Sequence, residues 1–301
     1  MSSERRGLLL GLAAYVMWGL FPLYFPLLEP GGALEVLAHR VVWSLVFVVA
    51  VLLVTRRGVR DLPRDRRGLS LLGLASVLIG VNWGVFIWAV NHDHVLEGSL
   101  GYFINPLVSV ALGVLVLGER LRPVQWTAVG IAAAGVAVLA VEAGRPPWIA
   151  LTLALTFGTY GLVKKVVGVG PVEGLTVETA ALTPLALGYL IWLGASGDST
   201  FTSHGPDHTW LLISSGAVTA VPLLFFAAAT AAAPLSQLGV LFYVNPMMQF
   251  LIGVLVRHEP LPAARLAGFA LVWVALIVFT ADALANHRRG ELALTAEAAA
   301  A

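Results

Sequence analysis

The chain has 301 residues, of which 58% are hydrophobic and 12% charged, and its mean hydropathy is +0.87. Soluble domains have about 45–50% apolar and about 25% charged residues, so this composition excludes an ordinary soluble enzyme. The absence of cysteine excludes thiolate metal sites and thiol nucleophiles, and a net charge of +1 gives no general attraction for nucleic acid. A protein that crosses a membrane many times remains.

Ten stretches are apolar and long enough to cross a hydrocarbon core, which takes about 20 helical residues. They lie at 7–28, 34–55, 69–91, 98–118, 123–141, 146–163, 174–197, 209–230, 235–256 and 263–281. The first is too long for the core of a secretory signal, so we interpret it as a permanent span. The run 209–256 has no charged residue and suits two spans, divided near Pro234. The predicted fold class is an all-α membrane protein with ten transmembrane helices.

Lys and Arg residues are distributed unevenly between the loops on the two sides. If the N-terminus is cytoplasmic, the inner segments hold fourteen of them and the outer segments three, namely Arg145, Arg257 and Arg265. Positively charged loops stay on the cytoplasmic side of a membrane. We therefore predict that both termini are cytoplasmic.

Two segments of the chain are related by an internal repeat. Residues 100–121 (LGYFINPLVSVALGVLVLGERL) and 240–261 (VLFYVNPMMQFLIGVLVRHEPL) are identical at eight of 22 positions. The shared Asn-Pro pair and the matching Glu119 and Glu259 set this repeat apart from the general likeness among apolar helices. Five spans separate the copies, and an odd number gives them opposite orientations in the membrane. The sequence therefore predicts two inverted five-helix repeats, an architecture typical of secondary transporters.

Several motifs carry a resemblance to a known family. They are 15–22 (YVMWGLFP), 35–44 (EVLAHRVVWS), 99–107 (SLGYFINPL), 157–165 (FGTYGLVKK) and 177–179 (VET). These motifs resemble the RarD branch of the EamA family, in the drug/metabolite transporter superfamily, and the similarity covers about residues 5 to 285. The resemblance implies ten helices in two inverted halves and the export or exchange of small metabolites across the inner membrane of a bacterial cell. It implies no particular substrate.

We divide the chain accordingly. A first EamA-like five-helix repeat covers 1–144, a second covers 145–286, and 287–301 is a cytoplasmic tail.

Candidate binding residues gather near the centres of the spans. Pro106 and Pro246 each remove a helical hydrogen bond, and the adjacent Asn105 and Asn245 place amide groups at the same depth. Breaks in both halves predict a central binding site framed by two broken helices, although a pair of packed structural kinks is the alternative. Aromatic side chains would line such a cavity. The candidate substrate-binding residues are Trp18, Arg40, Asn82, Tyr102, Asn105, Tyr160 and Asn245.

Two charged residues lie clearly inside spans, Arg40 and Glu178, and charge at a helix centre costs at least about 2.5–3.5 kcal/mol. Arg40 is early in an inward-running span and Glu178 early in an outward-running one, so about 15 Å of depth separates them. We therefore predict that Glu178 pairs with Lys164 at the inner mouth. Arg40, with His39, would serve the outer mouth or an anionic group of the solute. His39, Lys164 and Glu178 are the candidate gating or coupling residues.

We therefore expect a secondary transporter that exports or exchanges small metabolites or drug-like solutes by alternating access. Transport would be coupled to an ion or proton, an exchange, or facilitated. The expected partners are a small-molecule solute and the lipid bilayer, without nucleic acid, and the protein would be a monomer. We expect no cofactor and no enzyme activity.

The alternative function is a polytopic membrane enzyme of lipid or isoprenoid metabolism. Such an enzyme needs clustered acids or a nucleophile–base pair at one membrane face, and the sequence has neither. Outer-loop histidines could in principle meet around zinc, but short polar loops commonly contain histidine, so we expect no metal site. These histidines are His92, His94, His204, His208 and His258.

Overall fold

The computed structural model describes residues 3–55, 63, 65–118 and 121–300, without the side chains at 117, 171, 235–236, 283–284 and 286–300. Glu119 of the repeat and most of the basic loop 56–67 lie outside the described residues.

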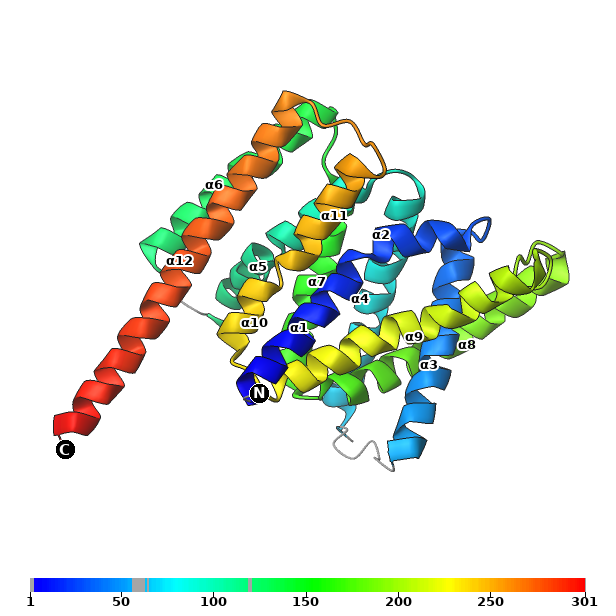
Figure 1. Cartoon of the computed structure of the whole chain (residues 1–301), viewed down its shortest axis with the longest axis horizontal. Helices are drawn as coiled ribbons and strands as arrows, with labels where there is room; N and C mark the ends of the chain where they lie inside the picture. The colour runs from blue at the N-terminus through cyan, green and yellow to red at the C-terminus, as the bar shows by residue number, and fades with distance from the viewer. Residues whose placement is uncertain (1–2, 56–62, 64, 119–120, 301) are drawn as a thin grey trace.

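All the secondary structure in the described part of the chain is helical (Figure 1). The helices are α1 (Ser3–Gly19), α2 (Phe21–Tyr24), η1 (Phe25–Leu28), α3 (Ala33–Thr55), α4 (Arg66–Asn91), α5 (Val95–Leu117), α6 (Pro123–Ala143), α7 (Trp148–Val167), α8 (Pro171–Ser196), α9 (Gly205–Thr230), α10 (Leu235–Leu241), α11 (Val244–Leu255) and α12 (Ala263–Ala300).

Ten apolar segments of this structure are long enough to cross a membrane. The first combines α1, α2 and η1, and the ninth lies within α10 and α11. Each predicted span coincides with one of them, and no end differs by more than four residues. The ten-helix prediction is confirmed. The backbone of α12 continues through the predicted tail to Ala300.

Local sequence sets where these helices begin and end. Asp65 caps α4, because its Oδ2 accepts a hydrogen bond from the amide of Gly68 at 3.0 Å. Pro123 stands at the first position of α6, where the missing N–H is not needed. Gly168 ends α7 with a φ of +71°, a left-handed conformation that glycine adopts without strain.

The two Asn-Pro sites differ in backbone structure. Pro246 lies in the first turn of α11. The helix is interrupted just before that turn, at Phe242 and Tyr243, between α10 and α11. Pro106, by contrast, lies inside α5, which continues through it from Val95 to Leu117. The prediction of two broken helices is therefore met in the second half only. A proline in the first turn needs no amide donor, so a helix can restart there, whereas α5 has Pro106 in its middle.

The packing pairs agree with two related halves. When α1, α3, α4, α5 and α6 are matched in order with α7, α8, α9, α10–α11 and α12, each main contact has a counterpart. The pair α5–α7 corresponds to α1–α11, α4–α7 to α1–α9, and α3–α9 to α4–α8. The pairs α6–α12, α3–α8 and α5–α11 correspond to themselves. This pattern is consistent with the predicted inverted repeat.

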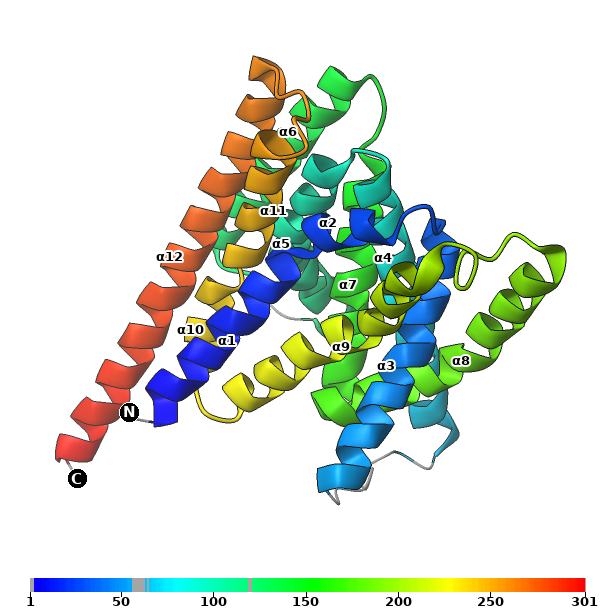
Figure 2. The same ribbon diagram turned by 45° about the vertical axis from the view of Figure 1, so that its right-hand side comes forward.

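The arrangement places the chain ends together and one helix pair at the side. Figures 1 and 2 show α6 and α12 side by side at one flank of the bundle, and the N- and C-termini at the same end. The apolar core that joins this flank to the rest includes Phe103 of α5, Phe250 of α11 and Phe269 of α12. Helices of both halves, together with the part of α12 that carries Phe279 and Thr280, enclose the cavity described next.

Candidate functional site

A cavity of about 960 Å³ lies between the two halves of the protein. Side chains from both repeats line it, and many of them are aromatic. The aromatic lining residues are Tyr15, Trp18, Phe21, Trp83, Phe86, Tyr102, Phe157, Tyr160, Phe226, Phe242, Tyr243 and Phe279. A space of this size and character suits a small solute with apolar parts.

The cavity opens toward one end of the bundle. Lys165 and Val240, which are exposed, form part of its wall near the end of α7 and within α10. The chain termini lie at that same end (Figure 2). At the other end, the hydroxyl of Tyr24 donates a 2.9 Å hydrogen bond to the carbonyl oxygen of Leu211, and Phe25 is buried. The wall of the cavity thus reaches the surface at one end of the bundle and is covered at the other.

All seven predicted substrate-binding residues line this cavity, as do Lys164 and Glu178. The sequence placed the seven substrate-binding residues on six different spans, and the fold brings them to one cavity. Whether they bind a solute stays a prediction.

Arg40 lies in the cavity wall and is 3% exposed. Its Nε donates a hydrogen bond of 2.7 Å to Oγ1 of Thr219 in α9. Its Cζ lies 4.2 Å from the ring centre of Trp83, an arrangement favourable for a cation–π interaction. Within the described residues, no carboxylate lies near enough to form an ion pair with Arg40.

Glu178 has two partners on α7. Lys164 Nζ lies 2.9 Å from its Oε1, and the Tyr160 hydroxyl donates to its Oε2 at 3.1 Å. Glu178 is 1% exposed, so both interactions act away from bulk water. The predicted pair between Glu178 and Lys164 is therefore present, and the structure joins α7 to α8 through it.

The two repeated asparagines have different surroundings. Asn245 Oδ1 accepts a 2.8 Å hydrogen bond from Gln249 Nε2. Asn105 Oδ1 is buried and has no hydrogen-bond partner. A buried amide oxygen without a partner is costly unless a ligand or water supplies a donor. Asn105 is thus the better placed of the two to meet a solute.

Asn82 uses its amide group within the protein. Its Nδ2 donates to the carbonyl oxygen of Leu153 and to Thr156 Oγ1, both at 3.0 Å, and its Oδ1 accepts from the Tyr102 hydroxyl at 3.3 Å. Asn82 therefore links α4 to α7 and positions Tyr102, an interhelical role that polar side chains commonly have inside membranes.

His39 lies apart from the cavity. Its ring stacks on Phe201 with 4.5 Å between ring centres, and Trp43 Nε1 lies 3.3 Å from its Nδ1. The structure therefore does not bring His39 to the cavity with Arg40, and a gating role for His39 stays a prediction. Consecutive residues of a helix point about 100° apart, and here Arg40 faces the cavity whereas His39 faces Phe201 and Trp43.

The sequence matches known proteins over its whole length. Residues 5–141 match the EamA-like transporter family. The chain is 56% identical to Protein RarD of Streptomyces exfoliatus, over 99% of this chain and 95% of that protein. It is 47% identical to the uncharacterized transporter YojE of Bacillus subtilis, over 93% and 95% of the two chains. It is 44% identical to Protein RarD of Escherichia coli, over 95% and 97%. This chain belongs to the EamA family, in its RarD-type branch.

Membership in this family makes the protein a multi-pass membrane transporter. One solved crystal structure has the same fold, with a TM-score of 0.58 at 19% identity over 92% of this chain and 98% of its own.

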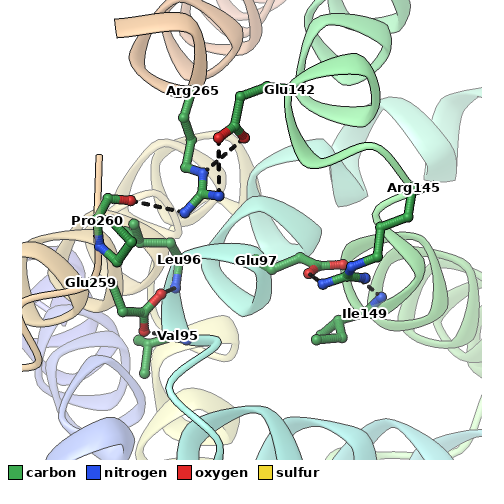
Figure 3. Close-up of polar contacts among 9 residues, drawn as sticks. All are labelled: Val95, Leu96, Glu97, Glu142, Arg145, Ile149, Glu259, Pro260 and Arg265. Atoms are coloured by element: carbon green, nitrogen blue, oxygen red, sulfur yellow. Dashed lines mark hydrogen bonds and ion pairs between the residues drawn. The ribbon is translucent and has the colours of Figure 1, made fainter. Parts of the chain in front are cut away.

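In this RarD-type protein, the closed end of the bundle is held by carboxylates. Glu259, in the loop after α11, accepts hydrogen bonds from the amides of Val95 at 2.5 Å and Leu96 at 3.0 Å, at the start of α5 (Figure 3). Glu97 in turn accepts from the amide of Ile149 at 3.0 Å and from Arg145 at 2.9 Å. These contacts satisfy amide groups at the starts of α5 and α7 that have no partner within their own helix.

The loop that carries Glu259 is anchored at two further points. Arg265 reaches both the carboxylate of Glu142, at 3.1 and 3.2 Å, and the carbonyl oxygen of Pro260, at 2.8 Å (Figure 3). Arg257 pairs with Asp93 in the loop before α5 at 2.6 Å. This set of contacts ties α11 and α12 to α4, α5 and α6.

Two polar residues of the RarD-type cavity escaped the sequence analysis. Gln249 is buried and lies one helical turn after Asn245, so the spacing of four residues could have revealed it. Thr219 is a single hydroxyl in an apolar span, and nothing in the sequence marks it as the partner of Arg40.

Proposed function

We propose that this protein is a secondary transporter that exports or exchanges small metabolites or drug-like solutes by alternating access. The observation that carries the proposal is the aromatic cavity between the two halves, accessible from one end and closed at the other. Matched packing pairs in the two halves support a rocking of one half against the other around a fixed site. We propose no enzymatic activity.

The end at which the cavity opens is proposed to face the cytoplasm of a bacterial cell. The start of α1, which carries Arg5 and Arg6, lies at that end (Figure 2), and Lys164 and Lys165 near the end of α7 line the cavity. The positive-inside rule favours this placement in the inner membrane. Both termini would then be cytoplasmic.

A pair of glycine substitutions tests whether the cavity is the transport path. Gly239 lines the cavity and Gly194 lies on α8, and a side chain added at either would meet nothing within 4 Å. Gly239→Trp should obstruct the cavity, whereas Gly194→Trp adds the same bulk on the outside of the bundle.

The readout is metabolite profiling of medium and cytosol from cells that lack the protein or overproduce one variant. We expect a solute that leaves cells with the wild type and with Gly194→Trp, and stays inside with Gly239→Trp at equal protein level. Equal export by both variants would exclude this cavity as the path. If no solute differs between deletion and overproduction, the transporter proposal itself fails.

A further inference from the structure

Arg40 gives the cavity wall a positive charge that no carboxylate among the described residues compensates. Arg40 is protonated at every physiological pH. Glu178, the carboxylate that lines the cavity, does not neutralise Arg40, because it is paired with Lys164 and Tyr160. Throughout the described residues, the hydrogen bond to Thr219 is the one hydrogen bond that the Arg40 side chain makes.

Arg40 is fixed where it is and does not reach toward water at the end of its helix. Thr219 holds its Nε from the opposite helix, and three rings surround the guanidinium. Its Cζ lies 4.2, 5.2 and 5.5 Å from the ring centres of Trp83, Phe21 and Phe25. Phe25 is itself almost fully buried, so it separates the guanidinium from the closed end of the bundle. The terminal nitrogens of Arg40 are thus left for the cavity.

An unpaired charge at this depth needs a counter-charge. Burying an ion without a partner is costly, and removing one partner of a buried pair is strongly destabilising. A guanidinium offers parallel N–H donors that match the two oxygens of a carboxylate. Lys165 lies where the wall is exposed, so at the depth of Arg40 a single cation lacks a counter-charge, and a solute with one negative charge balances it there.

We propose that Arg40 is the anion-binding group of the cavity, and that the transported solute is a small organic monoanion, a carboxylate with an apolar or aromatic body. The aromatic wall would hold that body, and the same wall with Arg40 in it rejects organic cations. This inference rests on the proposed function, since it names the solute class of the same cavity.

The test begins with the purified wild-type protein and three probes that share one ring and one chain. The probes are 3-phenylpropionate, 3-phenylpropanamide and 3-phenylpropylamine, which are negative, neutral and positive. The measurement is the midpoint of thermal unfolding, since a ligand that binds the folded state raises it. We expect the carboxylate to raise the midpoint at millimolar concentration and the amide and amine to leave it unchanged. Stabilisation by the amine, or none by the carboxylate, would overturn the proposal.

Variants then assign the effect to Arg40. Arg40→Gln should weaken carboxylate binding about tenfold or more, as expected for a charged hydrogen bond, and Arg40→Lys should weaken it less. Arg122→Gln is the control, because it removes one positive charge from an ion pair with Asp282 that is not part of the cavity wall. Full carboxylate affinity in a folded Arg40→Gln protein would show that the anion binds elsewhere.

Two further results keep the outcome clear. If Arg40→Gln does not fold, Thr219→Val replaces it. This variant keeps the charge of Arg40 and removes the hydroxyl that positions the guanidinium, so we expect carboxylate affinity to fall severalfold.

The glycine experiment separates the two proposals. If the wild type exports a solute but binds no carboxylate, the proposed solute class is wrong and the proposed transporter function stands. If the wild type binds the carboxylate but exports no solute, the proposed transporter function is wrong.

Discussion

At the scale of single residues, the repeated asparagines should respond differently to the same substitution. Asn105→Ala removes an amide whose oxygen has no partner, so we expect little change in thermal stability. Asn245→Ala removes the 2.8 Å acceptor of Gln249 Nε2 and leaves it only the longer contact of 3.5 Å with the carbonyl oxygen of Trp18, which costs about 1 kcal/mol. Thermal unfolding in detergent compares the two, and both should reduce export. Equal loss of stability would contradict the difference in surroundings, and unchanged export by both would place the solute elsewhere.

The ion pair between Lys164 and Glu178 allows a second prediction. Breaking it in Glu178→Gln or Lys164→Met should cost about 2–3 kcal/mol, somewhat less than for a fully buried pair because Lys164 is partly exposed. The exchange Lys164→Glu with Glu178→Lys should restore part of the loss.

The control for this exchange is the corresponding swap of Arg40 and Glu178, which form no contact with each other. We expect no restoration there. Restoration by the control swap alone would mean that the two buried charges meet during transport.

Charge inside an apolar span is a signal that the sequence displays openly, which is why Arg40 and Glu178 could be identified in advance. The direction in which a neighbouring residue faces is not visible in the sequence, so the position of His39 away from the cavity could not be predicted. Thr219 acquires its role only when α9 packs on α3, a long-range contact that no local pattern encodes.

At the scale of helices and loops, Glu259 makes the closure of one end dependent on pH. Burial raises the pKa of its carboxyl to about 7 in spite of the amide hydrogen bonds from Val95 and Leu96. Asp93 raises and Arg265 lowers that pKa as well. The closed end therefore retains a proton that an exposed carboxyl would have lost near pH 4.5. Its stabilising contribution is complete at low pH and is lost as the pH rises through about 7.

We accordingly expect the amides at the start of α5 to exchange hydrogen faster at pH 8 than at pH 6, beyond the intrinsic effect of pH. In Glu259→Gln, which cannot ionise, that additional dependence should disappear. In Glu142→Gln, which alters another carboxylate of the same network, it should persist. An additional dependence that survives Glu259→Gln would assign the titration to a different group.

The positions of the helices could be predicted from the composition of the chain, but whether a helix is continuous could not. The ten spans are recognisable because each is an apolar run bounded by charges or turn residues. Identical Asn-Pro pairs nevertheless produced a continuous α5 and an interrupted α10–α11. Where a helix starts relative to its proline decides this difference, and the residues before the two prolines are similarly apolar in both halves.

At the scale of the whole molecule, the orientation of the repeats can be tested directly. Arg122 precedes α6 and His258 precedes α12, and the inverted arrangement places them on opposite sides of the membrane. Since the chain has no cysteine, Arg122→Cys and His258→Cys each introduce a single reactive thiol. We expect an impermeant thiol reagent added outside intact cells to label the second and not the first. Labelling of both from one side would exclude the inverted arrangement.

The uncompensated guanidinium of Arg40 also gives the transport cycle an electrical asymmetry. An empty site carries its positive charge through the change of access, whereas a site occupied by a monoanion moves as a neutral unit. A potential that is negative inside acts on the first step and not on the second, with about 2.3 kcal/mol per 100 mV for a charge that crosses the full field. It draws the empty carrier toward the cytoplasm-facing state, where it can be loaded again. A membrane potential that is negative inside would thus favour outward movement of the solute, without a coupling ion bound to the protein.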